Sequence, residues 1–361
     1  LDLQGGENLI EPKAWYSIQE LYAELRLNKF VLSVGRKPIY WGQAHIGALL
    51  YSDNAKNMDS IGISTLPLRW PWIFKYLGDL KTEIYFSRLD EKRSPPRDYF
   101  LGWRLGVKPS DWFEGNLGMI YQFMGDGMPK GSASDYFLEF LGVRKSYSAN
   151  ANDSSNFTNR AFAGDLRVNI QNLRWPTSIY TEQHLEDCCG DIGSLIKNTL
   201  SYSFGVLTRA AQASDAHRFR LEYSKTSTNL YYHPTWQSGT SRAQRIAGNP
   251  LGRDAQGVYA DWSRDWTRRG VDSHLGIFWE QRERRELVQK MDDGGKIVIQ
   301  DFRPEFQHSE KRWGVNASGK VALTGAYFLD LGSELVRVTG KENSNRKTWE
   351  WGMYSSLSRR W

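Results

Sequence analysis

The sequence has no long hydrophobic run. Apolar residues make up 40% of the 361 residues and charged residues 24%. No stretch approaches the ~18–20 consecutive apolar residues that a membrane-spanning helix requires. The composition therefore excludes a helical membrane protein. It leaves a transmembrane β-barrel open, because only alternate residues of a barrel strand face lipid.

Catalytic motifs and cysteines are also scarce. The chain has no GxSxG elbow, no HExxH helix and no phosphate-binding loop, since the glycine-rich segment 125–131 lacks a strand–loop–helix setting. The two cysteines, Cys188 and Cys189, are adjacent and could form a strained vicinal disulfide or stay free, so they do not fix the compartment. No cleavable leader is recognisable at Leu1, and we expect a chain that is either cytosolic or already processed.

Charge of one sign is not concentrated anywhere in the chain. The 47 basic and 41 acidic residues leave a net charge of +6, and the basic residues are interleaved with acidic ones. This pattern does not favour nucleic acid as a partner. An acidic glycan or lipopolysaccharide is a better match for a mildly basic surface.

Aromatic residues are abundant, with 15 Trp and 18 Tyr in an aromatic content of 14%. The two aromatic girdles of a membrane barrel would account for them. A soluble carbohydrate-binding or propeller-like β protein would use them as well, so this feature alone leaves both classes open.

The stretch 347–361 indicates which class applies. Its residues alternate over about 15 positions, much longer than the usual strand, and one parity is apolar: Trp349, Trp351, Met353, Leu357 and Trp361. We interpret it as a lipid-facing row whose opposite parity, including Glu350, Tyr354 and Arg360, lines a lumen. Trp361 is then a candidate contact for the outer-membrane insertion machinery.

Alternating strands recur through the chain, and the connections between them alternate in length. Short connections are expected near residues 28–29, 108–110, 172–173, 211–215, 267–270 and 324–325. Long ones are expected at 39–57, 125–159, 185–199, 225–254 and 283–311. Up-and-down barrels of outer membranes show this rhythm, with short periplasmic turns and long extracellular loops, whereas a Greek-key sandwich does not.

The predicted fold class is therefore all-β, a single antiparallel up-and-down barrel over residues 1–361, integral to the outer membrane of a Gram-negative cell. About 16–18 strands are expected, and 18 is reachable because residues 297–306 can add a strand. Single helical turns are expected at 72–77 and 136–141. Surrounding lipid, including lipopolysaccharide, is an expected partner.

The polar parity predicts a lumen with charges of both signs. The lumen charges singled out are Arg104, Arg167, Arg218, Arg220 and Glu222. Salt bridges among such groups could close the lumen, whereas a pore would keep it wet and less compensated. The sequence leaves both possibilities open.

The long connection 39–57 is predicted to fold inward or to pack under the rim and plug the barrel. Its apolar residues favour burial, and its glycines allow tight turns. The plug residues expected are Trp41, Gly42, Gly47 and Asn54.

The densest acid and histidine group is Glu182, His184, Glu186 and Asp187. A surface hydrolase or a zinc site could use such residues, but no second cluster with ligand spacing accompanies them. We favour a hydrogen-bond network at the rim, with no catalytic residue, no metal and no cofactor.

Three motifs resemble the Wzi capsule-assembly family. They are GRKPIYWGQAHIGALLYSDNA at 35–55, IYTEQH at 179–184, and the pair YYHPTWQSG and GNPLGRDAQGVYADW within 231–262. The resemblance implies an outer-membrane barrel of 18 strands that acts as a lectin, holds capsular polysaccharide on the cell surface and is not an enzyme. The chain departs from the family pattern in showing no helical-bundle region and in having Cys188–Cys189.

The loops combine aromatic rings, which stack on sugar faces, with arginines, which grip carboxylates. An acidic polysaccharide, such as a uronic-acid-containing capsule, fits this combination. The predicted glycan-binding residues on the loops and rim are Tyr180, Glu182, His184, Tyr232, His233, Trp236, Arg242, Arg245, Arg253 and Asp254. The alternatives are a porin for sugars or small solutes and, third, an outer-membrane hydrolase.

Overall fold

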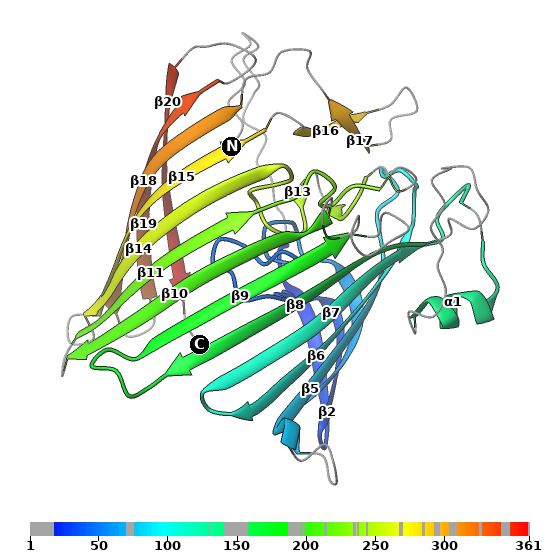
Figure 1. Ribbon diagram of the computed structural model, residues 1–361, viewed down its shortest axis with the longest axis horizontal. Helices are drawn as coiled ribbons and strands as arrows, with labels where there is room; N and C mark the ends of the chain where they lie inside the picture. The colour runs from blue at the N-terminus through cyan, green and yellow to red at the C-terminus, as the bar shows by residue number, and fades with distance from the viewer. Residues whose placement is uncertain are drawn as a thin grey trace.

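One large antiparallel sheet dominates the computed structural model (Figure 1). The structure describes residues 18–69, 76–128, 130–140, 158–186, 199–212, 215–233, 238–242, 245–266, 270–283, 286–291, 297–302, 309–324, 327–340 and 347–359, together with Ile196 and Trp236. The predicted turn at 72–77, the two cysteines, Asp187 and Trp361 lie wholly or partly outside these residues.

Sixteen strands form the main sheet and follow one another in sequence order, except that β3 pairs with β5 rather than with β4, and β4 is a short strand paired with β5. They are β1 (Leu21–Leu27), β2 (Phe30–Arg36), β3 (Asp59–Thr65), β4 (Leu68–Arg69), β5 (Asp79–Arg88), β6 (Tyr99–Ser110), β7 (Phe113–Phe123), β8 (Thr158–Ile170), β9 (Thr177–Glu186), β10 (Ser201–Gln212), β11 (Asp215–Lys225), β14 (Ala255–Trp266), β15 (Val271–Arg282), β18 (Glu310–Thr324), β19 (Tyr327–Thr339) and β20 (Lys347–Arg359). The sheet curves into the wall of a barrel (Figure 1).

Two small ribbons and one helix lie outside the main sheet. β12 (Ser241–Arg242) pairs with β13 (Arg245–Ile246), and β16 (Glu286–Met291) pairs with β17 (Ile297–Phe302). Helix α1 (Ala133–Phe140) overlaps the helical turn expected at 136–141. No helix among the described residues is long and apolar enough to cross a membrane.

The all-β antiparallel prediction is confirmed, and the number of strands falls in the predicted range. The main sheet has 16 strands, and the two small ribbons lie outside it. The extra strand expected from residue 297 is present as β17, but it pairs with β16 in the ribbon rather than within the wall. The sequence pattern missed β3, because only Ile61 and Ile63 on its outward side are large and apolar.

The connections alternate in length as predicted. The strand ends that short turns join, such as those at Asn28 between β1 and β2, lie at one end of the barrel, and the strand ends that long connections join lie at the other (Figure 1). Asn28 has a positive φ of 55°, which asparagine tolerates better than most residues. One long connection, residues 89–98 between β5 and β6, was not anticipated.

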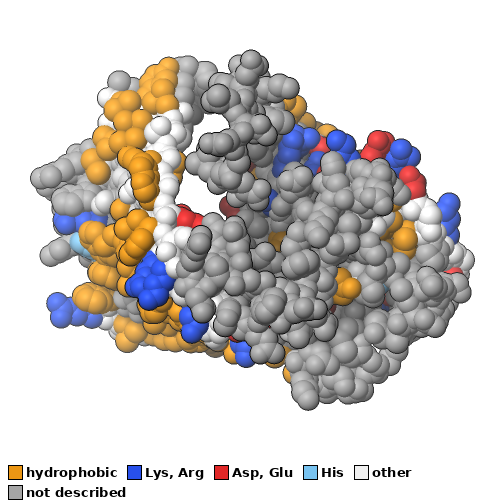
Figure 2. Space-filling view, turned by 90° about the horizontal axis from the view of Figure 1, so that it is seen from above, with side chains coloured by type: hydrophobic (Ala, Val, Ile, Leu, Met, Phe, Trp, Pro, Cys, Tyr) orange, Lys and Arg blue, Asp and Glu red, His pale blue; other side chains and the backbone are white. Residues whose placement is uncertain are grey.

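The two faces of the wall differ in polarity. Most outward side chains of β20 are apolar and highly exposed, including Trp351 and Met353 at 73% each. The inward row of β9 is instead polar and buried from Ser178 to Glu186. Figure 2, viewed from the long-connection end, shows hydrophobic side chains along the outer wall and a hollow within it. A polar interior behind an apolar exterior is the arrangement of a barrel set in lipid.

Candidate functional site

The connection between β2 and β3, residues 37–58, lies inside the barrel and is called here the inner loop (Figure 1). Trp41, Leu49 and Leu50 on this loop are almost completely buried. The Trp41 indole N–H donates to the Glu83 carboxylate on β5 at 2.9 Å. The loop therefore occupies lumen space beside the wall.

A carboxylate on β9 holds the first half of the inner loop. Glu182 is buried, and its carboxylate accepts backbone N–H bonds from Gln43 at 2.7 Å, from Ala44 at 3.1 Å and from Leu49. A buried charge is tolerated only when donors surround it, and backbone N–H groups converging on one anion supply them. The loop backbone is thus shaped around this side chain.

A second carboxylate, on β11, binds the adjoining part of the loop. Glu222 accepts backbone N–H bonds from His45 at 2.7 Å and from Ile46 at 3.2 Å. Tyr180 on β9 donates its hydroxyl to the same carboxylate at 2.6 Å. Glu182 and Glu222 together therefore attach the inner loop to two strands of the wall.

Gly42 permits the close approach of the loop to Glu182. A Cβ at this position would collide with the Glu182 carboxylate and would lie 2.6 Å from the Ala48 Cβ. We expect Gly42→Ala to destabilise the docked loop by about 1–3 kcal/mol, the usual cost of overpacking. Hydrogen exchange of the loop amides measures this effect. The matched control is Gly352→Ala, where an added Cβ meets nothing within 4 Å. Equal protection of the loop in both variants would contradict the close-approach role.

The long connection between β11 and β14, residues 226–254, packs on the inner loop and is called the covering loop. The Tyr231 hydroxyl donates to the Leu49 carbonyl and accepts the Asn249 N–H, both at 2.6 Å. The Asn249 side chain donates to the Gly47 carbonyl at 2.6 Å. A Cβ on Gly47 would collide with the ring of Pro250. The two loops are therefore one hydrogen-bonded body.

Most of the predicted glycan-binding residues are buried within this body or behind it. They are Tyr180, Glu182, His184, His233, Trp236, Arg242 and Arg253. Arg242 donates to the Asp59 carboxylate at 2.8 Å and to the Asn57 carbonyl. The Arg253 guanidinium lies 5.1 Å from the ring centroid of half-buried Tyr232. These side chains hold loop to loop and loop to wall.

The histidines of this group are enclosed by aromatic rings. His184 packs edge-on against Tyr231 at a centroid distance of 5.9 Å, and His233 packs likewise against Trp236 at 5.2 Å. Burial lowers the pKa of His233 to about 4, so its ring is neutral at neutral pH. A neutral, enclosed imidazole is suited to packing and not to acid–base work on a bound substrate.

Polar side chains, several of them exposed, gather where the inner loop meets the start of β1 and the β12–β13 ribbon. They line a groove of about 680 Å³, called the outer groove, formed by Gln19, Glu20, Pro38, Asp53, Asn54, Ala55, Lys56, Asn57 and Arg245. Arg245 is exposed, and Asn54 donates its side-chain amide to the Ile246 carbonyl at 2.8 Å. The groove lies at the long-connection end of the wall.

Of the predicted glycan-binding residues, Arg245 lines the outer groove, and Asn54, which was predicted as a plug residue, lines it as well. Asp254, also predicted, is half-buried at the end of the covering loop and lines a separate small cavity. Lys56 and Asp53 were missed as ligand candidates. The SDNA segment that the sequence singles out contains Asp53, but nothing in the chain order places it beside Arg245.

The predicted lumen charges lie on the inward face. Arg104 pairs with Asp165 at 3.3 Å, and Arg167 pairs with Glu114 at 3.6 Å. Arg218 and Arg220 line an inner cavity of about 240 Å³ that also contains His45, Asp261, Asp272, His274 and Lys320. Part of the lumen is thus filled by charge pairs and part remains open. Within the described ranges, no three His, Cys, Asp or Glu side chains are placed to hold a metal ion.

Comparison with known proteins identifies the family. Residues 13–345 match the family described as capsule assembly protein Wzi. The chain belongs to the Wzi family. No curated protein matches the chain.

Solved structures share the fold of this Wzi-family chain. The Wzi structure of Escherichia coli, described as an outer membrane protein involved in group 1 capsule assembly and as a carbohydrate-binding β-barrel, has a TM-score of 0.72 at 17% identity. The alignment covers 94% of this chain and 69% of that one. Pseudomonas aeruginosa OpdL has a TM-score of 0.52 at 9% identity, over 94% of this chain and 81% of its own. OccD3 (OpdP) of the same organism has a TM-score of 0.51 at 10% identity, over 96% and 78%.

Family and fold together settle where this Wzi-family protein resides. It is an integral β-barrel of the Gram-negative outer membrane. Since long loops of such barrels face outward, the outer groove faces the cell exterior and the short turns face the periplasm.

Proposed function

We propose that this Wzi-family barrel binds an acidic surface polysaccharide in the outer groove and helps to anchor or assemble it at the cell surface. The observation that carries the proposal is the groove itself, an exterior polar cleft of about 680 Å³ built on a fixed loop. Membership of a capsule-assembly family, and the carbohydrate binding attributed to the Escherichia coli structure, support it.

The chemistry of the groove suits a polymer that carries both hydroxyls and carboxylates. Lys56 and Arg245 supply positive charge, and an arginine can bind a carboxylate through two parallel hydrogen bonds. Asp53, Asn54 and Glu20 supply acceptors for sugar hydroxyls. The predicted residues buried behind the groove act indirectly, because they hold the two loops that shape it.

No step of this function requires a reaction. A protein that retains a polysaccharide can make several contacts along the same polymer at once. The binding free energies of modest individual contacts then combine through multivalency. We propose a non-enzymatic role in which outer-membrane lipid, including lipopolysaccharide, and the insertion machinery are the remaining partners. The chain acts as one barrel domain, with residues 39–57 as its plug.

Arg245 and Lys56 provide the direct test. We expect the double variant Arg245→Ala, Lys56→Ala to bind a uronic-acid polysaccharide at least tenfold more weakly, because each lost charge-assisted hydrogen bond contributes about 1.5–3 kcal/mol. Binding is measured by titration of the purified protein and by retention of polysaccharide on cells. Added salt should weaken wild-type binding, since both cations are accessible to solvent.

The control is Arg69→Ala, which removes an exposed arginine at the short-turn end, where it pairs with Asp79 at 3.1 Å. This variant should bind as the wild type does. Unchanged binding by the double variant would exclude the outer groove as the site, even if the wild type binds the polymer.

A channel for sugars or small solutes is the second candidate. The hollow seen from the long-connection end favours it (Figure 2). Planar-bilayer recordings separate the two functions, because a porin passes steady current whereas a plugged barrel does not. Steady conductance in the wild type, without polysaccharide binding, would establish the channel.

A further inference from the structure

The outward face of β14, β15, β18, β19 and β20 carries three aligned rows of side chains. The row nearest the long connections is polar, the second contains three tryptophans and the third is mostly aliphatic. In strand order they are Gln256, Gln281, Lys311, Thr339 and Lys347; then Val258, Trp279, Trp313, Arg337 and Trp349; then Ala260, Ile277, Val315, Leu335 and Trp351. We call this surface the tryptophan–arginine face.

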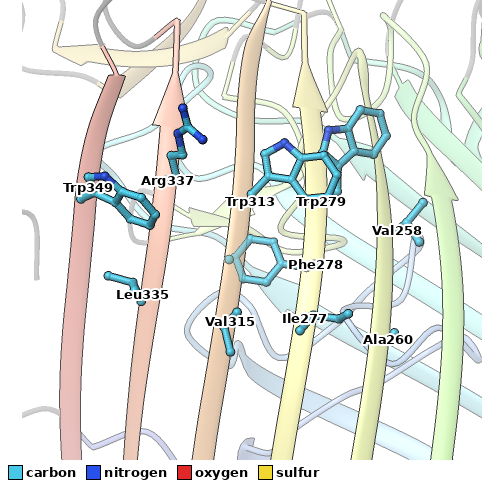
Figure 3. Close-up of a pocket in the computed structure, with 11 residues that line it drawn as sticks. Val258, Ala260, Ile277, Phe278, Trp279, Trp313, Val315, Leu335, Arg337 and Trp349 are labelled. Atoms are coloured by element: carbon cyan, nitrogen blue, oxygen red, sulfur yellow. The ribbon is translucent and has the colours of Figure 1, made fainter.

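The face is hollowed, not flat. A groove of about 590 Å³ runs across it and is lined by residues of the second and third rows, together with Phe278. The Trp279 and Trp313 rings lie 6.2 Å apart at an angle of 53°. Figure 3 shows Leu335, Val315 and Ile277 on the side of the groove away from the strand ends. Its lining is almost entirely apolar, so the groove is suited to hydrocarbon chains.

Arg337 is unusual in this row. Its guanidinium lies 6.0 Å from the Trp349 ring centroid, between Trp349 and Trp313 (Figure 3). It belongs to the same parity as lipid-facing Leu335, where a cation is unfavourable by an amount that falls towards the interface. An anionic group at the interface would offset this cost.

Two further cations flank Arg337 in the row above. Lys311 and Lys347 are exposed and lie on either side of Thr339, so about 10 Å of sheet separates their strands. Among the described residues, none of the three cations takes part in an ion pair. Two described acids, Asp254 and Glu283, lie beside Gln281 at this rim, and the Glu283 carboxylate accepts a bond from Gln281 at 2.8 Å. Arg337 in the groove lining and the two lysines above it therefore form an amphipathic surface with a net positive edge.

We propose that the tryptophan–arginine face is a binding site for lipopolysaccharide, the phosphorylated glycolipid of the outer leaflet. The phosphates bind Lys311, Arg337 and Lys347, and the acyl chains follow the groove beside Trp313 and Val315. Charge-assisted bonds from arginine and lysine are the strong contacts that phosphate makes with proteins. The site lies on the outside of the wall, so it is independent of the polysaccharide site in the outer groove.

The test compares lipopolysaccharide retention by purified barrels in mild detergent, measured by native mass spectrometry. The triple variant Lys311→Gln, Arg337→Gln, Lys347→Gln should retain about tenfold less lipopolysaccharide than the wild type, a loss of ~1.4 kcal/mol in binding free energy. Arg337→Gln alone should account for part of this loss. The matched control is Lys225→Gln, which removes an outward cation at the same end of the barrel but on β11, away from the tryptophans.

Competition with other lipids tests whether lipopolysaccharide is the ligand of the tryptophan–arginine face. Phosphatidylglycerol and phosphatase-treated lipopolysaccharide should displace bound lipopolysaccharide poorly from the wild type. The proposal fails if the triple variant keeps as much lipopolysaccharide as the wild type, or if phosphatidylglycerol competes equally. Heat unfolding in lipid-free detergent verifies that the variant is folded. Polysaccharide binding by the triple variant should be unchanged, which separates this proposal from the proposed function.

Discussion

Replacing Glu182 by alanine is expected to release the inner loop from the wall. The substitution leaves the backbone N–H groups of Gln43, Ala44 and Leu49 without their acceptor inside the barrel. Each buried donor left unpaired costs about 1–3 kcal/mol, so the docked loop loses several kcal/mol. No other change of a single side chain should affect the loop as much.

Two measurements detect the release of the inner loop from the wall. Hydrogen exchange of the amides at 43–49 should accelerate by at least tenfold, because local opening no longer breaks three hydrogen bonds to a carboxylate. Planar-bilayer conductance should rise, as it should when residues 46–54 are deleted. Glu182→Gln should be milder, since an amide oxygen still accepts hydrogen bonds.

The control for this prediction is Glu334→Ala. Glu334 is an inward carboxylate on β19 that remains exposed to the lumen, so its removal should alter neither exchange nor conductance. Full protection of the loop amides in Glu182→Ala would show that the loop docks without the carboxylate. An unchanged conductance after the 46–54 deletion would rule out a plugging role.

Trp236→Ala is expected to lower the stability of the covering loop by about 3–5 kcal/mol, the range for truncating a buried tryptophan. Trp236 is completely buried and packs against His233. Polysaccharide binding should fall as a consequence, because the covering loop helps to shape the outer groove. Heat unfolding and binding are measured on the same preparation. Trp236→Phe should keep most of both.

The same experiment decides between two roles for the ring. The sequence predicts that Trp236 stacks on a sugar, and the structure places it inside the protein. Loss of binding with unaltered heat unfolding in Trp236→Ala would favour direct stacking. Loss of both, with recovery of both in Trp236→Phe, supports the packing role.

The wall could be predicted because lipid imposes a simple pattern on strands. Alternation at Trp349 and Trp351 indicates one lipid-facing row, and the rhythm of short and long connections orients the barrel. The prediction fails where the pattern is weak. β3 has serine and glycine on its inward side, which leave little contrast with a loop.

The interior was harder to predict than the wall. Apolar residues such as Trp41, together with Gly42 and Gly47, indicate a loop that packs tightly. Their partners cannot be deduced, because Glu182 and Glu222 look like ordinary inward charges until the loop backbone is placed around them. Sequence distance hides these contacts, which span more than 130 positions.

The glycan residues show a different difficulty. A loop aromatic such as Tyr232 or Trp236 has the same chemistry whether it stacks on a sugar or on another loop. Only tertiary structure shows that the covering loop buries Trp236 while Arg245 stays exposed. Lys56 and Asp53 become candidates only through their position beside Arg245 in the outer groove.

The most direct test of the account is an experimental structure of the protein with a uronic-acid oligosaccharide bound. The account predicts density in the outer groove, with a sugar carboxylate on Arg245 and the inner loop still docked on Glu182. Oligosaccharide density deep in the lumen, with residues 39–57 displaced from the wall, would contradict it.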